Sequence, residues 1–269
     1  MQVFDSTNLK EVKLPSGNSS KGENGQVTIV GGSHLFHGAP LLALTTASRL
    51  VDMVYFTSPE PAIGEVAEKL KSNLFSFIWI PWEEREEYIE KSDAVLIGPG
   101  MMRYKKQIGD AGGEETREIT RDLLLKFPKK KWVIDAGSLQ MLEASWIPEG
   151  SILTPNKKEY DRLFAGKEES WVAQKYKCVL VRKLPVTRVC SASKCVEVRG
   201  GNAGLTKGGT GDVQAGIAVG LLAKNDAFLA GAASSFLVKK AAGNLFGKSG
   251  TYYNADDLAN EVGRVFSEI

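Results

Sequence analysis

The sequence predicts one α/β domain whose mostly parallel β-sheet carries helices on both faces. From residue 27 onward, short runs rich in β-branched residues alternate with helical segments of about 10–15 residues, the pattern of parallel strands joined by crossover helices. No repeat, low-complexity segment or Pro/Ser-rich linker interrupts this pattern. The 269 residues, of which 43% are apolar, are enough for one well-buried core.

The predicted strands of the first part are short apolar runs that stop at Gly, Pro or Asp. The run at 27–30 stops at Gly31, the run at 94–97 at Gly98, and the run at 132–134 at Asp135. The strands expected here are 27–30, 53–57, 75–80, 94–97, 132–134 and 152–153. The helices expected between and after them are 38–50, 61–71, 83–90, 116–127, 139–144 and 158–164.

The pattern changes after residue 178. Three short β-runs joined by tight turns are expected at 179–181, 187–191 and 195–198, and long helices at 212–222, 228–245 and 255–266. The first 20 residues show no such pattern and are expected to form a loosely packed arm. The predicted organisation is therefore an arm at 1–20 and one domain at 21–269.

Composition excludes several classes of protein. The 34 basic and 32 acidic side chains give a net charge of +2, which argues against a nucleic-acid partner. No apolar run approaches the roughly 18 residues of a membrane span, and the polar N-terminus is unlike a secretion signal. Three Cys without a CxxC pair favour a cytoplasmic protein, and a disulfide between Cys190 and Cys195 is not favoured.

Four predicted strand ends carry turns of Gly or Pro with small or polar residues. The turns are 31–33, 98–100, 135–137 and 154–156. Because parallel strands end at the same edge of a sheet, these turns are expected to outline one crevice, where such folds bind ligands.

The most informative segment is the glycine cluster at 200–212, which has six glycines and leads into an apolar helix. The amides of Gly209, Thr210 and Gly211 are expected to point out of the helix N-terminus, where they can bind an anion. Lys207 precedes the glycine pair, and no GKS or GKT follows, so the segment is not a Walker A loop. The dinucleotide GxGxxG pattern would follow the first strand, which this cluster does not.

Asp212 stands in the first turn of that helix. It either stabilises the positive end of the helix or serves as the base of a phosphoryl transfer, in which the amides hold the phosphoryl group and the carboxylate takes a proton from the attacking hydroxyl. Arg182 and Lys183 end a strand and could contact nucleotide phosphates. His34 and His37, the only histidines, are not expected to bind zinc.

At these residues the sequence resembles the NAD(P)H-hydrate dehydratases, carbohydrate-kinase-like members of the ribokinase superfamily. The resemblance lies in 21–33 (KGENGQVTIVGGS), FHGAP at 36–40, GPG at 98–100, DAGSL at 135–139, TPNKKEY at 154–160 and the glycine cluster ending in GGTGD. A terminal Asp-Leu at 257–258 also matches, and the resemblance covers residues 21–262. The implied fold is ribokinase-like.

The resemblance implies repair of NADH or NADPH that has gained water. The substrate hydroxyl would take a phosphoryl group from ADP or ATP with Mg²⁺, and the phosphate ester would then eliminate, with Asp212 as the catalytic base. The implied substrate-binding residues are Ala39, Gly100, Asn156 and Asp212. The implied nucleotide-binding residues are Arg182, Lys183, Thr187, Asn202, Gly208, Gly209, Thr210 and Gly211. A homo-oligomer is also implied, and no metal ligand from the protein is assigned.

The chain departs from the family pattern at three places. Asn156 stands where the family usually has His, Lys183 where it usually has Gly, and Gly137-Ser138 where it usually has Asp-Ala. Asn156 cannot titrate, and a side chain at position 183 is expected to close or reshape the loop on the adenine side. A small-molecule kinase of the same superfamily, or a nucleotide-binding homologue without activity, are the alternative functions.

Overall fold

A ten-stranded sheet forms the centre of the protein in the computed structural model, which describes residues 1–70, 74–104 and 110–268. The strand order is β1-β10-β9-β8-β7-β6-β5-β2-β3-β4. All neighbouring strands pair in parallel except β9, which is antiparallel to both β8 and β10. The strands are β1 (Gln2–Val3), β2 (Gln26–Val30), β3 (Met53–Thr57), β4 (Ile78–Trp79), β5 (Ala94–Ile97), β6 (Lys131–Ile134), β7 (Ile152–Leu153), β8 (Val179–Arg182), β9 (Thr187–Cys190) and β10 (Cys195–Val198). The predicted single α/β domain with a mostly parallel sheet is confirmed.

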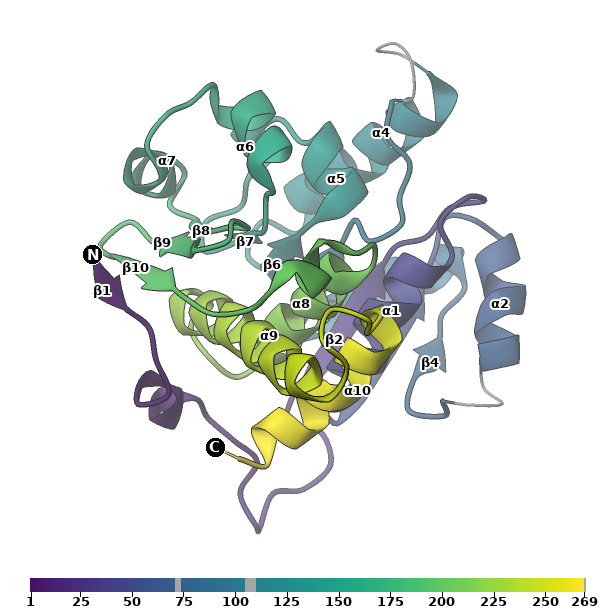
Figure 1. Ribbon diagram of the computed structural model, residues 1–269. Helices are drawn as coiled ribbons and strands as arrows, with labels where there is room; N and C mark the ends of the chain where they lie inside the picture. The colour runs from purple at the N-terminus through teal and green to yellow at the C-terminus, as the bar shows by residue number, and fades with distance from the viewer. Residues whose placement is uncertain (71–73, 105–109, 269) are drawn as a thin grey trace.

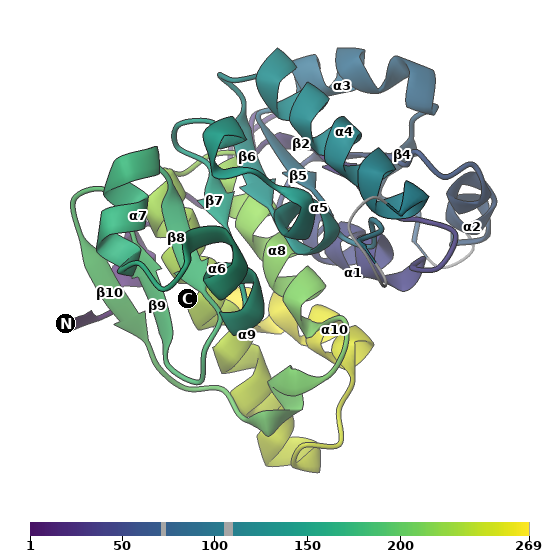
Figure 2. The same ribbon diagram turned by 90° about the horizontal axis from the view of Figure 1, so that it is seen from above.

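Helices cover both faces of the sheet (Figure 1). One face carries α1 (Gly38–Ala47), α2 (Ala62–Leu70), α8 (Thr210–Leu222), α9 (Ala227–Ser249) and α10 (Ala255–Phe266). The other face carries α3 (Arg85–Lys91), α4 (Ala111–Lys126), α5 (Ala136–Met141), α6 (Lys157–Phe164) and α7 (Glu169–Tyr176), and Figure 2 shows α3 to α6 from above. Short 3₁₀ segments are η1 (Asn8–Glu11), η2 (Trp82–Glu84), η3 (Ala144–Trp146) and η4 (Ala203–Thr206).

Strand β5 is apolar throughout because it contributes to two cores. Along β5, Ala94 and Leu96 belong to the core beneath α8, whereas Val95 and Ile97 belong to the core beneath α4. Successive side chains of a strand point to opposite faces, so a strand covered on both sides shows no polar alternation. This explains why a continuous apolar run located β5 in the sequence.

Close packing between α1 and α8 explains the small residues of both helices. A Cβ on Gly216 would lie 2.5 Å from the carbonyl oxygen of Ala43 and 3.0 Å from Cβ of Thr46. The small-residue stretch at 43–48 therefore serves helix packing within the subunit. This contact fixes α8, whose first turn holds Asp212, against α1 and the sheet.

The largest difference from expectation lies at the N-terminus. The arm at 1–20 is not loosely packed, because β1 pairs in parallel with β10 and Phe4, Leu9 and Val12 are buried in the core. Figure 1 shows the N-terminus at the end of the sheet opposite to β4. The separation of an arm at 1–20 from a domain at 21–269 stays a prediction.

Some helix boundaries also differ from the sequence prediction. The helix expected at 116–127 begins five residues earlier, at Ala111, because the Asp110 side chain accepts a hydrogen bond from the Gly113 amide and caps the helix there. Helix α7 and strand β1 are not among the predicted elements. The expected strand at 75–80 is confined to Ile78–Trp79, and residue 71 of the helix expected at 61–71 lies outside the described residues.

The structure pairs Cys190 with Cys195, which the sequence did not favour. The two residues face each other across the antiparallel pair β9–β10, with Cα atoms 4.1 Å apart, and their sulfur atoms are bonded. The register of β9 and β10 brings the two cysteines opposite each other, and this register cannot be predicted from cysteine spacing alone. In the described part of the chain, every helix is too short or too polar to span a membrane.

Candidate functional site

The carboxyl ends of β2, β5, β6, β7 and β8 meet at one edge of the sheet, as the four turns predicted. A cavity of about 420 Å³ opens there. Its lining includes Ala39 of α1, Gly100 after β5, Asp135 after β6, Asn156 after β7, and Asp212 of α8. Segments far apart in the sequence thus supply the walls of one site.

Two glycines let the turn after β5 approach its neighbours closely. Gly98 has φ +119°, and a Cβ there would lie 1.8 Å from the carbonyl oxygen of Asp135. Gly100 has φ +72°, and a Cβ there would lie 2.6 Å from the carbonyl oxygen of Phe36. Both positions require glycine for steric and backbone reasons. Gly100 therefore brings main chain into the wall of the cavity.

The glycine cluster forms the opposite wall and ends in the first turn of α8. Gly209 precedes the helix with φ +89°, and a Cβ on it would lie 2.5 Å from Cδ1 of Leu42. The first bond within the helix runs from the Val213 amide to the Gly209 carbonyl, so the amides of Gly211 and Asp212 precede it. The Thr210 amide, also expected to be free, instead donates to the carbonyl of Lys207. The helix presents an anion-binding end to the cavity.

Asp212 is the third residue of α8, and its carboxyl group faces this cavity. Burial raises the pKa of Asp212 to about 7, the carboxylate of Asp135 adds to the rise, and the ammonium of Lys183 opposes it. A carboxyl group that titrates near neutral pH can accept a proton from a hydroxyl and release it again. Its environment therefore suits Asp212 to the work of a general base.

An ion pair between the partly buried Lys183 and the buried Asp135 lies beside Asp212. The Nζ of Lys183 donates to Oδ1 of Asp135 at 2.8 Å, and the Thr154 hydroxyl donates to the same oxygen at 2.6 Å. Burial by itself lowers the pKa of Lys183, but the carboxylates of Asp135, Glu159 and Asp212 outweigh it and leave that pKa raised. Lys183 therefore carries a positive charge inside the site.

Asn156 caps α6 through a reciprocal pair of hydrogen bonds. Its Oδ1 accepts from the Glu159 amide at 3.0 Å, and Oε2 of Glu159 accepts from the Asn156 amide at 2.9 Å. The other oxygen of Glu159 accepts from Gln140 at 2.9 Å. The amide oxygen of Asn156 is thus committed to the helix, and its Nδ2 is the atom that can reach a ligand.

A second cavity, of about 560 Å³, adjoins the first on the side of β9 and η4. Lys239 of α9 joins two of its walls, because its buried ammonium donates to the carbonyl oxygens of Pro185 at 2.6 Å and Gly200 at 3.2 Å. Asn202 holds a third wall by donating to the Ala242 carbonyl and accepting from the Gly204 amide and the Tyr253 hydroxyl. Several side chains thus fix the shape of an otherwise glycine-rich loop.

Most residues predicted for the site lie in these two cavities. All four predicted substrate-binding residues line the smaller one, together with Gly208 and Gly209. The predicted nucleotide-binding residues that line the larger one are Lys183, Thr187, Asn202, Thr210 and Gly211. The roles of these residues stay predictions, because the lining of a cavity does not assign a ligand.

Arg182 is the exception because it lines neither cavity, and its role as a nucleotide contact stays a prediction. Successive residues of a strand point to opposite faces, so Arg182 lies on the face away from Lys183. Its guanidinium pairs with Glu169 at 2.5 Å and lies 4.3 Å from the ring centroid of Tyr160. Both contacts belong to the core beneath α6 and α7, and Arg182 lines neither cavity.

The sequence did not reveal five polar residues of the site. Glu159, Gln140 and Arg103 line the smaller cavity, and Lys239 and Gln214 line the larger one. A lysine within the apolar helix α9 was the one available signal, because such a residue needs buried partners. Among the residues that the structure describes, no group of three His, Cys, Asp or Glu side chains is arranged to hold a metal ion.

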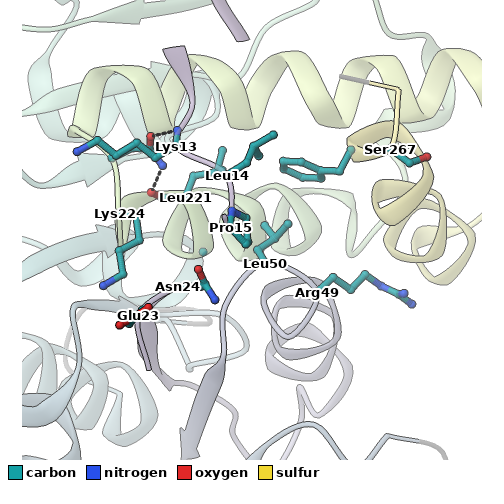
Figure 3. A pocket seen from close by; sticks show the side chains of 13 residues that line it. Lys13, Leu14, Pro15, Glu23, Asn24, Arg49, Leu50, Leu221, Lys224 and Ser267 are labelled. Carbon is teal, nitrogen blue, oxygen red and sulfur yellow. Dashed lines mark hydrogen bonds between the residues drawn. The ribbon is translucent and has the colours of Figure 1, made fainter. Parts of the chain in front are cut away.

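A third cavity, of about 450 Å³, lies at the other edge of the sheet (Figure 3). Its lining comes from the N-terminal segment, the ends of α1 and α8, and the C-terminal helix. The side chains of Lys13 and Arg49 extend toward opposite ends of it, and Lys224 pairs with Asp93 at 3.5 Å. These cations do not converge, so the cavity has no evident centre for an anion.

Comparison with known proteins identifies the family. A family model described as NAD(P)H-hydrate dehydratase matches residues 27–264. The chain belongs to the NAD(P)H-hydrate dehydratase family. This confirms the resemblance found at the glycine cluster and the strand-end turns.

Relatives of the dehydratase family resemble the chain over nearly its whole length. A bifunctional NAD(P)H-hydrate repair enzyme of Methanocaldococcus jannaschii is 31% identical over 96% of this chain and 51% of that protein. An ADP-dependent (S)-NAD(P)H-hydrate dehydratase of Nitrosopumilus maritimus is 28% identical over 96% of this chain and 95% of that protein. The chain thus spans about half the length of the bifunctional relatives.

A solved structure of the family shares the fold. The ADP/ATP-dependent NAD(P)H-hydrate dehydratase of Bacillus subtilis, co-crystallised with ATP and Mg²⁺, superposes with a TM-score of 0.79. It is 21% identical, and the match covers 99% of this chain and 98% of that one. The ribokinase-like fold expected from the sequence is confirmed.

Proposed function

We propose that the protein dehydrates hydrated NADH or NADPH with ADP or ATP as phosphoryl donor. The observation that carries the proposal is the place of Asp212. Its carboxyl group, whose pKa is about 7, lies at the amide end of α8 in a cavity that adjoins a second one. Two adjoining cavities, one of which contains a base next to the shared residue Gly211, suit a reaction that joins a hydroxyl to a phosphoryl group.

In the proposed reaction, the smaller cavity holds the hydrated nicotinamide and the larger one the nucleotide. Asp212 takes the proton of the substrate hydroxyl as its oxygen attacks the terminal phosphorus. The amides of Gly211 and Asp212 stabilise the charge that develops on the phosphoryl oxygens. Phosphate then leaves the ring carbon, the lone pair of the ring nitrogen drives its departure, and the loss of a ring proton restores the double bond.

The cavity linings support this division. Ala39 and Gly100 provide a surface of small residues and main chain, against which a planar ring can lie, and Nδ2 of Asn156 can donate to it. Thr187, Thr210 and Gly211 line the cavity assigned to the nucleotide. Mg²⁺ is proposed to accompany the nucleotide as part of the substrate. A homo-oligomer and a cytoplasmic location remain predictions.

The test is incubation with hydrated NADH, Mg²⁺ and either ADP or ATP, followed by absorbance at 340 nm. Return of the NADH absorbance that depends on the nucleotide supports the proposal. A stable phosphorylated product without NADH would instead identify a small-molecule kinase. Protection by nucleotide in a thermal melt, without turnover of either kind, would indicate a homologue that binds but does not react.

A further inference from the structure

Arg103 lies at the mouth of the smaller cavity, shortly after the turn that follows β5. Its side chain is exposed and lines the cavity, whereas Met101 and Met102 before it are buried. A Cβ on Gly137 would lie 2.3 Å from the carbonyl oxygen of Met101, so the main chain that leads to Arg103 is packed against α5. The reaction described above gives this cation no part.

The charge of Arg103 is not matched by a carboxylate of the protein. In the described part of the chain, its guanidinium makes one hydrogen bond, from Nη1 to Oε1 of Gln140 at 3.3 Å, and no ion pair. A guanidinium has five N–H donors, so four remain for a ligand.

Gln140 and Glu159 hold this hydrogen bond in place. Nε2 of Gln140 donates to Oε1 of Glu159 at 2.9 Å, which leaves Oε1 of Gln140 to accept from Arg103. Glu159 is buried and also accepts from the Asn156 amide at 2.9 Å. Two side chains therefore connect the guanidinium to the main chain after β7, on the wall of the same cavity.

The other charges of the smaller cavity do not favour an anionic substrate. The carboxyl groups of its lining are those of Asp135, Glu159 and Asp212, and the cations are Lys183 and Arg103. Lys183 is already paired with Asp135 at 2.8 Å. Arg103 is therefore the cation of this lining whose charge is available to a ligand.

Hydrated NADH would bring negative charge to this mouth. When the hydrated ring lies beside Asp212, the ribose on its ring nitrogen has to leave by the open side of the cavity, and the diphosphate follows the ribose. A cavity of about 420 Å³ holds the ring and its ribose but not the whole dinucleotide. The phosphates therefore lie outside the cavity, at the level of the exposed Arg103.

We propose that Arg103 binds the diphosphate of the hydrated dinucleotide and so selects substrates that carry phosphate on the nicotinamide ribose. The inference rests on the proposed function. A planar guanidinium can donate two parallel hydrogen bonds to phosphate oxygens, which makes arginine well suited to this contact. The contact lies away from the reacting ring, so it contributes to the binding of substrate rather than to the chemical step.

A structural role for Arg103 predicts a different pattern. If the residue only supports Gln140, its loss disturbs the cavity for every substrate alike. If it binds the diphosphate, its loss weakens the dinucleotides but spares hydrated reduced nicotinamide riboside, which has no phosphate. A comparison of these substrates therefore separates the two roles.

The experiment measures kcat and KM from the return of absorbance at 340 nm, with hydrated NADH, hydrated NADPH and hydrated reduced nicotinamide riboside as substrates. For Arg103→Met we expect the KM of both dinucleotides to rise about tenfold to a hundredfold, the loss typical of charge-assisted hydrogen bonds, with kcat within threefold of wild type. The kcat/KM of the riboside should change less than threefold, and Arg103→Lys should recover part of the lost affinity. Arg121→Met is the matched control and should leave all three substrates unchanged, because Arg121 is exposed on α4 and lines neither cavity.

A binding measurement makes the test independent of turnover. Calorimetry gives the Kd of NADH and of reduced nicotinamide riboside for the wild type and for Arg103→Met. A selective loss of NADH affinity in a protein whose wild type never restores NADH would support the contact and reject the proposed reaction. Equal weakening of NADH and the riboside would overturn the inference, as would a wild type that binds NADH no more tightly than the riboside. A loss confined to NADPH would also overturn it, because the additional phosphate of NADPH lies on the adenosine ribose.

Discussion

Replacement of Asp212 by Asn should abolish most of the activity and at the same time stabilise the fold. Asn has nearly the shape of a protonated Asp but cannot take a proton from the substrate hydroxyl. Loss of a general base typically costs about 10²–10⁴ in rate, so we expect at least a hundredfold loss of turnover. The variant should still bind nucleotide, because the amides of the helix end are unchanged.

The gain in stability follows from the raised pKa of Asp212. The pKa rises from 3.8 to about 7 on folding. Between these values the unfolded chain has lost the proton that the folded protein still holds, so stability falls as the pH rises from about 4 to about 7. At 1.36 kcal/mol per unit, the raised pKa of Asp212 lowers the free energy of unfolding by at most about 4 kcal/mol at pH 8 and by about 2 kcal/mol at pH 5.

Asp212→Asn should therefore unfold at a higher urea concentration than the wild type at pH 8, with a smaller difference at pH 5. The assay combines urea unfolding at both pH values with the NADH-restoration rate. Asp226→Asn is the control, because Asp226 is an exposed N-cap of α9 and Asn caps a helix equally well. A turnover within threefold of wild type would remove Asp212 as the base. If the variant is less stable than wild type at pH 8, the claim that the ionised Asp212 carboxylate destabilises the fold is refuted.

Three further outcomes are expected. Gly211→Val should fold with a melting temperature within several degrees of wild type. It should lose turnover, because its side chain would occupy the space next to Nζ of Lys183. Unchanged activity would exclude the N-terminal end of α8 from the mechanism. In the wild type, kcat/KM should rise tenfold per pH unit below about 7 and level off above it, since the base must be ionised, and a profile flat from pH 5 to 8 would contradict this. Replacement of both Cys190 and Cys195 by Ser should cost about 2 kcal/mol of unfolding free energy in urea, because the bridge closes a loop of only a few residues; a loss above about 4 kcal/mol would show a larger role.

The sequence predicted the placement of the site better than its internal contacts. The position of the turns at Gly98, Asp135 and Asn156 in the site could be predicted, because parallel strands end at one edge of the sheet and glycine marks close backbone approach. The glycine cluster before α8 was legible for the same reason, and with it Asp212. These features depend on local chain geometry, which residue types reveal.

The contacts that escaped prediction depend on which face of a strand a side chain occupies. Arg182 and Lys183 are adjacent and both basic, yet one joins a buried network on Glu169 and the other enters the site. If the register of β8 shifted by one residue, Arg182 and Lys183 would exchange faces of the sheet. The side chain of Lys183 points to Asp135, a contact that the sequence did not predict, and its effect on the adenine-side loop stays a prediction. The bond between Cys190 and Cys195 depends on register in the same way.

The pairing of β1 with β10 has a consequence for the order in which the chain assembles. Gln2 and Val3 lie opposite Val196 and Glu197, so almost two hundred residues separate the partners in sequence. Contacts between such distant residues close a long loop and form slowly. On the ribosome, Phe4 cannot reach its place beside Phe236 until most of the chain has emerged. This segment is synthesised before its partners and is thus among the last to dock, and its apolar side chains depend until then on chaperones or on non-native contacts to stay out of water.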